Sequence, residues 1–161
     1  MTTIIDLKQI TDPIDRCLKL LGFAKVGKRQ WHRETEEIKQ VFLLDRFRYE
    51  PKNRLYIFGD VRRLNPASAS SPFLYPMGGD VADHAQDFQE FMNALDQEYT
   101  LDPPSRRADI ISSALVGPMK IFLESFNSEA GSLELLLKLN SSSAFHILPD
   151  VRAQMDAAKS L

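Results

Sequence analysis

Apolar residues recur along the start of the chain first with a helical period and then with the two-residue period of strands. A helix is predicted over residues 12–22, because apolar side chains there follow the three- and four-residue spacing of one helix face. Asp12 can cap this helix and Pro13 fits its first position, while Gly22 can close it in the left-handed conformation.

Three strand-like runs follow within about residues 30–64. They cover residues 30–35, 38–44 and 54–61. The segments between them are too short for a crossover helix, so the runs are expected to pair as antiparallel neighbours.

Residues 65–79 contain three prolines and two glycines, a composition typical of a loop. Connections of this length inside a compact domain are often functional. The apolar residues Phe73 and Tyr75 favour a flap that packs back on the sheet. The alternative is an exposed binding tip.

The rest of the chain, residues 80–160, has a helical pattern. A helix over residues 81–99 is expected to bury an apolar side and to expose an acidic side. The acidic side consists of Asp80, Asp83, Asp87 and Glu90. Further helices are predicted from Ser105, after a division at Gly117-Pro118, over 133–139 and over 150–159.

These elements predict one α+β domain over residues 1–161, an antiparallel sheet of three or more strands packed against four or five helices. With 43% apolar and 26% charged residues, the composition is that of a soluble globular protein. No leader and no membrane-spanning stretch is recognised, so a cytoplasmic protein without membrane contact is expected. The single cysteine, Cys17, lies on the apolar stripe and is expected to be buried.

Charge is unevenly divided along the chain although the net charge is only −2. Residues 25–65 hold eleven Lys or Arg and six Asp or Glu, whereas no basic residue lies between Arg63 and Arg106. An acidic surface without cations would steer a basic partner toward it. The alternative is an ordinary solvated helix back.

The basic segment supports a second hypothesis, nucleic-acid binding. Its candidate residues combine cations with a ring able to stack on bases: Lys28, Arg29, Trp31, Arg33, Arg46 and Arg48. Acidic residues mixed into the same strands would repel a polyanion. The alternative is a solvated sheet face with cross-strand ion pairs.

No motif identifies a catalytic or cofactor site. The three histidines, His32, His84 and His146, are not at metal-ligand spacing, and acids around His84 are expected to favour its protonated form. The sequence has neither a strained serine elbow nor a phosphate-binding glycine loop. We therefore expect no metal, no cofactor and no assigned catalytic residue.

Residues 17–34 resemble the opening of the bacterial domain of unknown function family 4304, in which a helix ends in Leu-Gly-Phe, here Leu21-Gly22-Phe23, before a basic glycine turn and an aromatic-bearing strand. Residues 38–44, 57–59 and 118–137 are also similar to that family. The chain departs from it at Asp45-Arg46-Phe47, where the family tends to show a Gln-Lys-Ser-like stretch. The resemblance implies an α+β domain and, since similar small domains occur near polymorphic toxin systems, an immunity role.

The leading hypothesis is a non-enzymatic protein-binding module, an immunity protein that neutralises a bacterial toxin through the acidic helix face. The expected partner is a basic toxin domain. The expected contact residues come from the acidic side and the loop: Asp80, Asp83, Asp87, Glu90, Phe73 and Tyr75. Nucleic-acid binding ranks second, and an uncharacterised enzyme third.

Overall fold

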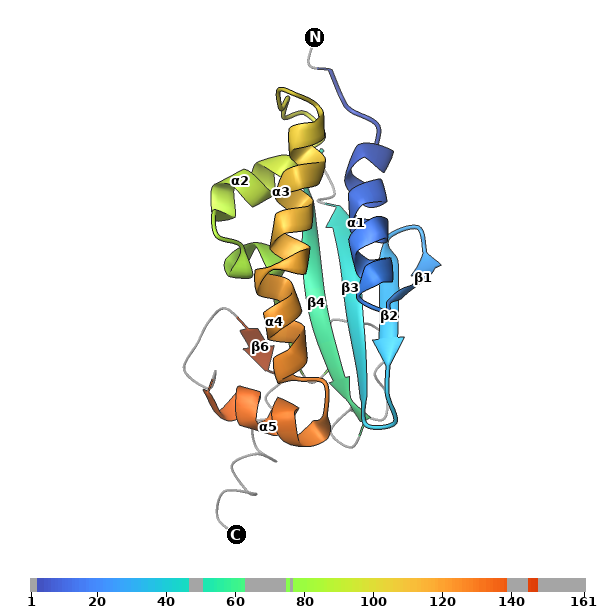
Figure 1. The fold of residues 1–161 in the computed structure, drawn as a ribbon, viewed down its shortest axis with the longest axis vertical. Helices are drawn as coiled ribbons and strands as arrows, with labels where there is room; N and C mark the ends of the chain where they lie inside the picture. The colour runs from blue at the N-terminus through green and yellow to red at the C-terminus, as the bar shows by residue number, and fades with distance from the viewer. Residues whose placement is uncertain (1–2, 47–50, 63–74, 76, 139–144, 148–161) are drawn as a thin grey trace.

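The computed structural model describes residues 3–46, 51–62, 75, 77–138 and 145–147. They form a six-stranded antiparallel sheet whose strands lie in sequence order. Three helices cover one face of this sheet, α1 (Lys8–Leu20), α3 (Ser105–Val116) and α4 (Pro118–Ser125) (Figure 1). The predicted α+β class is confirmed.

Three of the six strands were predicted from the alternating pattern. The strands are β1 (Ala24–Gly27), β2 (Gln30–Glu34), β3 (Ile38–Arg46), β4 (Asn53–Val61), β5 (Met77–Asp80) and β6 (Phe145–Ile147). β2, β3 and β4 match the predictions, whereas β1, β5 and β6 lie in segments predicted as a turn, a loop and helix. β5 has no alternation of its own; it is a strand because residues 77–80 pair with β4.

The register of the strands decides which side chains meet the helices. Phe42 of β3 lies opposite Trp31 and Ile57, and all three are buried in the core with the helices. Val41 and Phe58 pair one position away, so they lie on the opposite face of the sheet. The helices contribute to this core mainly through Ile10, Ile14, Leu18, Ile111, Leu115 and Met119.

Helix α1 begins four residues earlier than predicted, and the expected start at Asp12-Pro13 is wrong. Pro13 lies inside the helix, where it removes one backbone hydrogen bond. Burial of Ile10 and Ile14 on either side of it offsets that loss. The predicted end is confirmed, because Gly22 has φ +89° and the Phe23 N–H returns to the Leu18 carbonyl at 2.8 Å.

The predicted helix over residues 81–99 is also wrong. The segment instead forms a short 3-10 helix, η3 (Val81–His84), followed by α2 (Phe88–Ala94). A carboxylate caps the start of each element, since Asp80 accepts from the Ala82 N–H at 3.0 Å and Asp87 accepts from the Glu90 N–H at 2.9 Å. Each acid therefore caps a new helical turn instead of lying along one helix face.

The predictions for the later helices hold in part. Gly117-Pro118 divides α3 from α4 as expected. Helix α5 (Glu129–Lys138) begins four residues before the predicted start at 133. Cys17 is 5% exposed, as predicted, and the expected helix over 150–159 lies outside the described residues.

Candidate functional site

The four predicted acidic contact residues do not share one surface. Asp80 is 7% exposed and pairs with Arg54 at 3.2 Å. Burial raises the pKa of Asp80, although the Ala82 N–H and the Arg54 guanidinium act in the opposite direction. Asp83 and Asp87 are exposed, and Glu90 is half-buried. Asp80 is thus a structural group, while the other three remain near the surface.

A groove runs between the η3–α2 segment and α3, with a volume of about 310 Å³. Asp87, Glu90 and Asp109 supply carboxylates to it, against a single guanidinium from Arg106. Its apolar lining comes from Ala85, Phe91, Ile110, Ala114 and Pro118. We call this feature the acidic groove.

Asp109 was not among the predicted contact residues. It lies 19 positions beyond Glu90 in the sequence, on a different helix. Only the packing of α2 against α3 brings the two carboxylates into one groove. The absence of Lys and Arg between Arg63 and Arg106 indicated an acidic surface in the sequence. That signal was assigned to a single helix, whereas the groove is formed by α2 and α3 together.

One ion pair crosses the groove. Arg106 Nη2 lies 3.3 Å from Glu90 Oε1, and both side chains are more than one third exposed. An exposed pair of this kind contributes about 0–1 kcal/mol. Because the pair is weak, a basic group of a partner can compete with Arg106 for Glu90 at little cost.

The loop residues of the predicted site lie apart from the groove. Tyr75 packs edge-on against Phe58, with ring centroids 6.4 Å apart, on the sheet face opposite the helices. Burial, assisted by the charge of Asp60, raises the pKa of Tyr75. The flap interpretation therefore fits Tyr75, whereas Phe73 lies outside the described residues.

Most of the described nucleic-acid candidates have structural contacts. Trp31 is 1% exposed, and its Nε1 donates to Asp15 at 2.6 Å. Arg33 donates to Gln40 and to the Leu21 carbonyl, and its guanidinium lies over the Phe23 ring at 4.8 Å.

The remaining basic candidates are spread over the sheet. Arg29 donates to Asn53 at 2.8 Å and to the Leu44 carbonyl at 3.3 Å. Lys28 and Arg46 are exposed, and Arg48 lies outside the described residues. Since Trp31 is enclosed in the core, this set presents no stacking ring next to its exposed cations.

The pKa of His84 is shifted in the direction opposite to that expected from the sequence. Burial lowers its pKa, and the nearby Asp83 carboxylate only partly compensates. The imidazole stacks on Phe122 with ring centroids 4.1 Å apart, and its Nε2 is buried without a hydrogen-bond partner. The expectation of a favoured protonated form was wrong because the ring is partly buried against Phe122 of α4 instead of standing among exposed acids.

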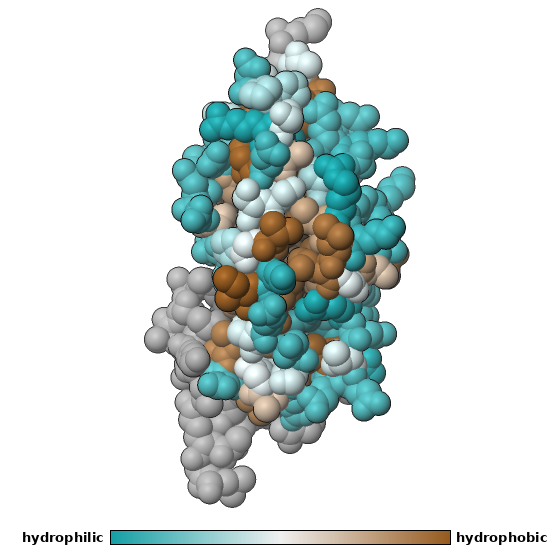
Figure 2. All heavy atoms as spheres, viewed as in Figure 1, coloured by the Kyte–Doolittle hydropathy of each residue, from teal (hydrophilic) through white to brown (hydrophobic). Residues whose placement is uncertain are grey.

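Hydrophobic side chains gather on the outer surface of the helices (Figure 2). The exposed large apolar residues of α1, α3 and α4 are Leu20 (82%), Val116 (46%) and Ile121 (72%). Contiguous apolar surface on a folded chain is typical of a contact region. This surface and the acidic groove both involve α3.

These features define an α+β protein with a meandering antiparallel sheet, helices on one face and an acidic groove beside them. Comparison with family models, curated proteins and solved structures gives no significant match. The resemblance to family 4304 therefore stays a prediction. In the described part of the chain, no helix is long and apolar enough to cross a membrane, and His, Cys, Asp and Glu form no group of three or more suited to a metal.

Proposed function

We propose that this chain is a protein-binding module that receives a basic segment of a partner protein in the acidic groove. The proposal rests on the composition of the acidic groove. Three carboxylates, those of Asp87, Glu90 and Asp109, lie beside an apolar lining in a volume of about 310 Å³. A segment that pairs a Lys or Arg with an apolar side chain complements both parts.

The groove suits recognition better than catalysis. Asp87 is held in place by its bond to the Glu90 N–H, so one carboxylate is oriented before a partner arrives. The groove lining contains no histidine, cysteine or lysine, so only its carboxylates and Ser113 could serve as base and nucleophile. Surface potential from the carboxylates would accelerate encounter with a basic partner.

The narrower form of the proposal is immunity against a bacterial toxin, with a basic toxin domain as the partner. It is supported by the resemblance of residues 17–34 to family 4304 and by the acidity of the groove. The nucleic-acid alternative has less support, because Trp31 is enclosed and the groove carries the wrong charge for a polyanion.

The test uses fluorescent peptides in which Arg alternates with Leu, and matched peptides in which Glu replaces Arg. We expect the basic peptide to bind at low salt and the acidic peptide not to bind, as measured by fluorescence anisotropy. Asp109→Asn and Glu90→Gln should each weaken binding roughly threefold to tenfold, since each removes one charge-assisted contact. High salt should weaken binding further.

Two exposed acids outside the groove provide matched controls, Glu98→Gln and Asp102→Asn. Both variants change the net charge as the groove variants do, so they should bind like the unaltered chain. Equal losses in groove and control variants would indicate a nonspecific charge effect and would contradict the proposal.

A further inference from the structure

The apolar lining that α3 and α4 give to the acidic groove continues beyond the groove itself. Ile110, Ala114 and Pro118 recur every four residues, and all three line the groove. Ile121 follows Pro118 by three residues. Residues three or four apart lie on the same side of a helix, so Ile121 is the next side chain in this series. We call these four residues the apolar row.

The division between α3 and α4 does not interrupt the apolar row. The Gly117 N–H donates to the Ser113 carbonyl at 3.2 Å, and the Ile121 N–H donates to the Gly117 carbonyl at 3.3 Å. These bonds join residues four apart, as in a continuous helix. Figure 1 shows α4 following α3 along the same face of the sheet. The row therefore keeps its helical spacing across Gly117.

Ile121 is the most exposed member of the apolar row. Its exposed fraction is 72%, whereas Ala114 is buried and Ile110 and Pro118 are half-buried. A single exposed isoleucine on a surface is ordinary. Here the exposed side chain continues a row that already lines a groove. A partner that fills the groove and extends along the row would remove the Ile121 side chain from water, which is favourable.

The other end of the apolar row is charged. Asp109 precedes Ile110 directly, and Arg106 of the same helix pairs with Glu90 at 3.3 Å, so the carboxylates of Asp109 and Glu90 lie at this end. Asp109 is twelve residues before Ile121, a distance of about 18 Å along a helix. The surface thus presents negative charge at one end and an exposed apolar side chain about three helical turns away.

The walls of the groove favour a helical partner over an extended one. They are formed by the η3–α2 segment and α3, which offer side chains but no strand edge. An extended segment usually binds by pairing its backbone with the edge of a sheet, whereas a helix satisfies its own backbone groups and binds through one face. A helix can therefore lie along this groove without leaving backbone groups unpaired.

Two other exposed apolar residues of the helix layer do not extend the groove. Ser112 contacts Cys17 of α1, with its Oγ 3.4 Å from the Cys17 Sγ. Val116 lies four residues after Ser112, so it is on the side of α3 that faces α1. Leu20 is on α1 itself. The two residues therefore serve to separate binding along the groove from binding over the whole helix layer.

We propose that the partner segment is an amphipathic helix that lies along the acidic groove and the apolar row. A Lys or Arg of this helix pairs with Glu90 and Asp109, and an apolar side chain about three turns away packs against Ile121. The positive end of a helix dipole is also favoured beside carboxylates, so the basic residue lies in the first turn of the partner helix. This inference rests on the proposed protein-binding function and adds the conformation of the partner.

The test compares two labelled peptides of identical composition and about 18 residues, long enough to form a helix. Both carry two Arg in the first turn on a background of Ala and Gln. In the row peptide, three Leu follow one Arg at four, eight and eleven positions, so they share one helix face. In the scrambled peptide, the same Leu are spread around the helix. Fluorescence anisotropy with the full chain should show that the row peptide binds roughly tenfold more tightly, and circular dichroism should show that it gains helix on binding.

Ile121→Gln should lower the affinity for the row peptide roughly tenfold and leave that for the scrambled peptide unchanged, because only the row peptide places Leu on Ile121. The side chain is exposed, so the variant should fold normally, and a thermal melt verifies it. Ile4→Gln is the matched control, since Ile4 is 60% exposed and precedes α1. Leu20→Gln tests the surface toward α1. Both should bind the row peptide like the unaltered chain.

Equal affinities for the row and scrambled peptides would overturn the inference. Unchanged binding in Ile121→Gln, or an equal loss in Leu20→Gln, would also overturn it. If Asp109→Asn still weakens binding of both peptides in those cases, the groove binds a basic segment and only the helical partner is refuted. If neither peptide binds, the inference and the proposed function are both contradicted.

Discussion

The two faces of the sheet are formed by alternate residues of the same strands, but their polar groups are satisfied to different degrees. On the helix-covered face, Gln40 donates to the carbonyls of Leu123 and Phe126, and Asn53 donates to the carbonyl of Leu95. On the opposite face, Asp60 and His32 each keep a buried atom without a partner. Neighbouring residues of one strand thus have different roles.

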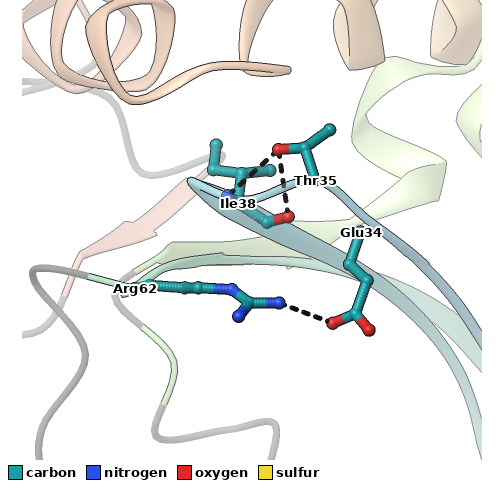
Figure 3. A network of polar contacts seen from close by, with 4 residues as sticks. All are labelled: Glu34, Thr35, Ile38 and Arg62. Carbon is teal, nitrogen blue, oxygen red and sulfur yellow. Dashed lines mark hydrogen bonds and ion pairs between the residues drawn. The ribbon is translucent and has the colours of Figure 1, made fainter.

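The difference follows from what covers each face. Helix ends offer free carbonyl groups, and Gln40 and Asn53 use those near the ends of α4 and α2. The opposite face is not covered by α1, α3 or α4, and polar side chains there pair with one another, as Arg54 does with Asp80 and Arg62 does with Glu34 (Figure 3). Both faces contain buried apolar residues, since Val41 is 0% and Phe58 is 4% exposed, so the two faces differ in how their polar groups are satisfied.

The largest difference between the two faces is expected when two neighbouring leucines of β3 are each replaced by alanine. Leu44 is 0% exposed in the core on the helix-covered face, and Leu43 is half-buried on the opposite face. Leu44→Ala should lower the free energy of unfolding by about 2–5 kcal/mol, because it leaves a cavity. Leu43→Ala should cost about 1 kcal/mol. Urea denaturation measures both, and equal losses would show that the two faces are packed alike.

A glycine substitution examines packing on the opposite face. A Cβ on Gly78 would lie 2.3 Å from Cδ1 of Phe58, so the Phe58 ring would have to move. Gly78→Ala should therefore lower the free energy of unfolding by about 1–3 kcal/mol and disturb the Tyr75 contact. Gly27→Ala is the control, since no atom lies within 4 Å of its added Cβ, and its effect should stay within about 0.5 kcal/mol. A neutral Gly78→Ala would mean that Phe58 is loosely held.

The smallest predicted effect concerns the pH dependence of stability. His84 has a folded pKa below its ordinary value of 6.5, so the unfolded state binds more protons just below that pH. Its contribution makes the free energy of unfolding rise as pH increases toward 6.5. His84→Phe, which keeps a ring against Phe122, should flatten this rise in denaturation curves measured at several pH values.

Asp60, on the opposite face, changes the free energy of unfolding with pH in the reverse direction. The folded pKa of Asp60 lies above 3.8, so its folded state binds more protons and stability falls as pH increases through that window. Asp60→Asn should remove this fall. An identical pH profile in both variants would contradict the assignment of opposite protonation preferences to the two groups.

Local signals explain which elements could be predicted. The alternation in β2 to β4, the left-handed Gly22 and the division at Gly117 depend on a few consecutive residues, and all three are confirmed. The helix predicted over 81–99 failed because Asp80 and Asp87 cap separate short elements, and a helical spacing does not reveal that competition.

The candidate sites depended more strongly on contacts between distant residues. Glu90 and Asp87 were predicted as an acidic surface, but Asp109 joins them only because α3 packs beside α2. Trp31 was proposed as a stacking ring, and the sheet register instead places it in the core. The sequence alone does not reveal which face of a strand will be covered.

The sequence by itself determined the α+β class, the central strands and the uneven charge, because these follow from composition and short-range periodicity. The tertiary structure decided the strand β5, the acidic groove and the burial of Trp31. Each of these depends on strand register or helix packing between segments far apart in the chain. Such contacts are fixed by the collective packing of the core, which no single segment encodes.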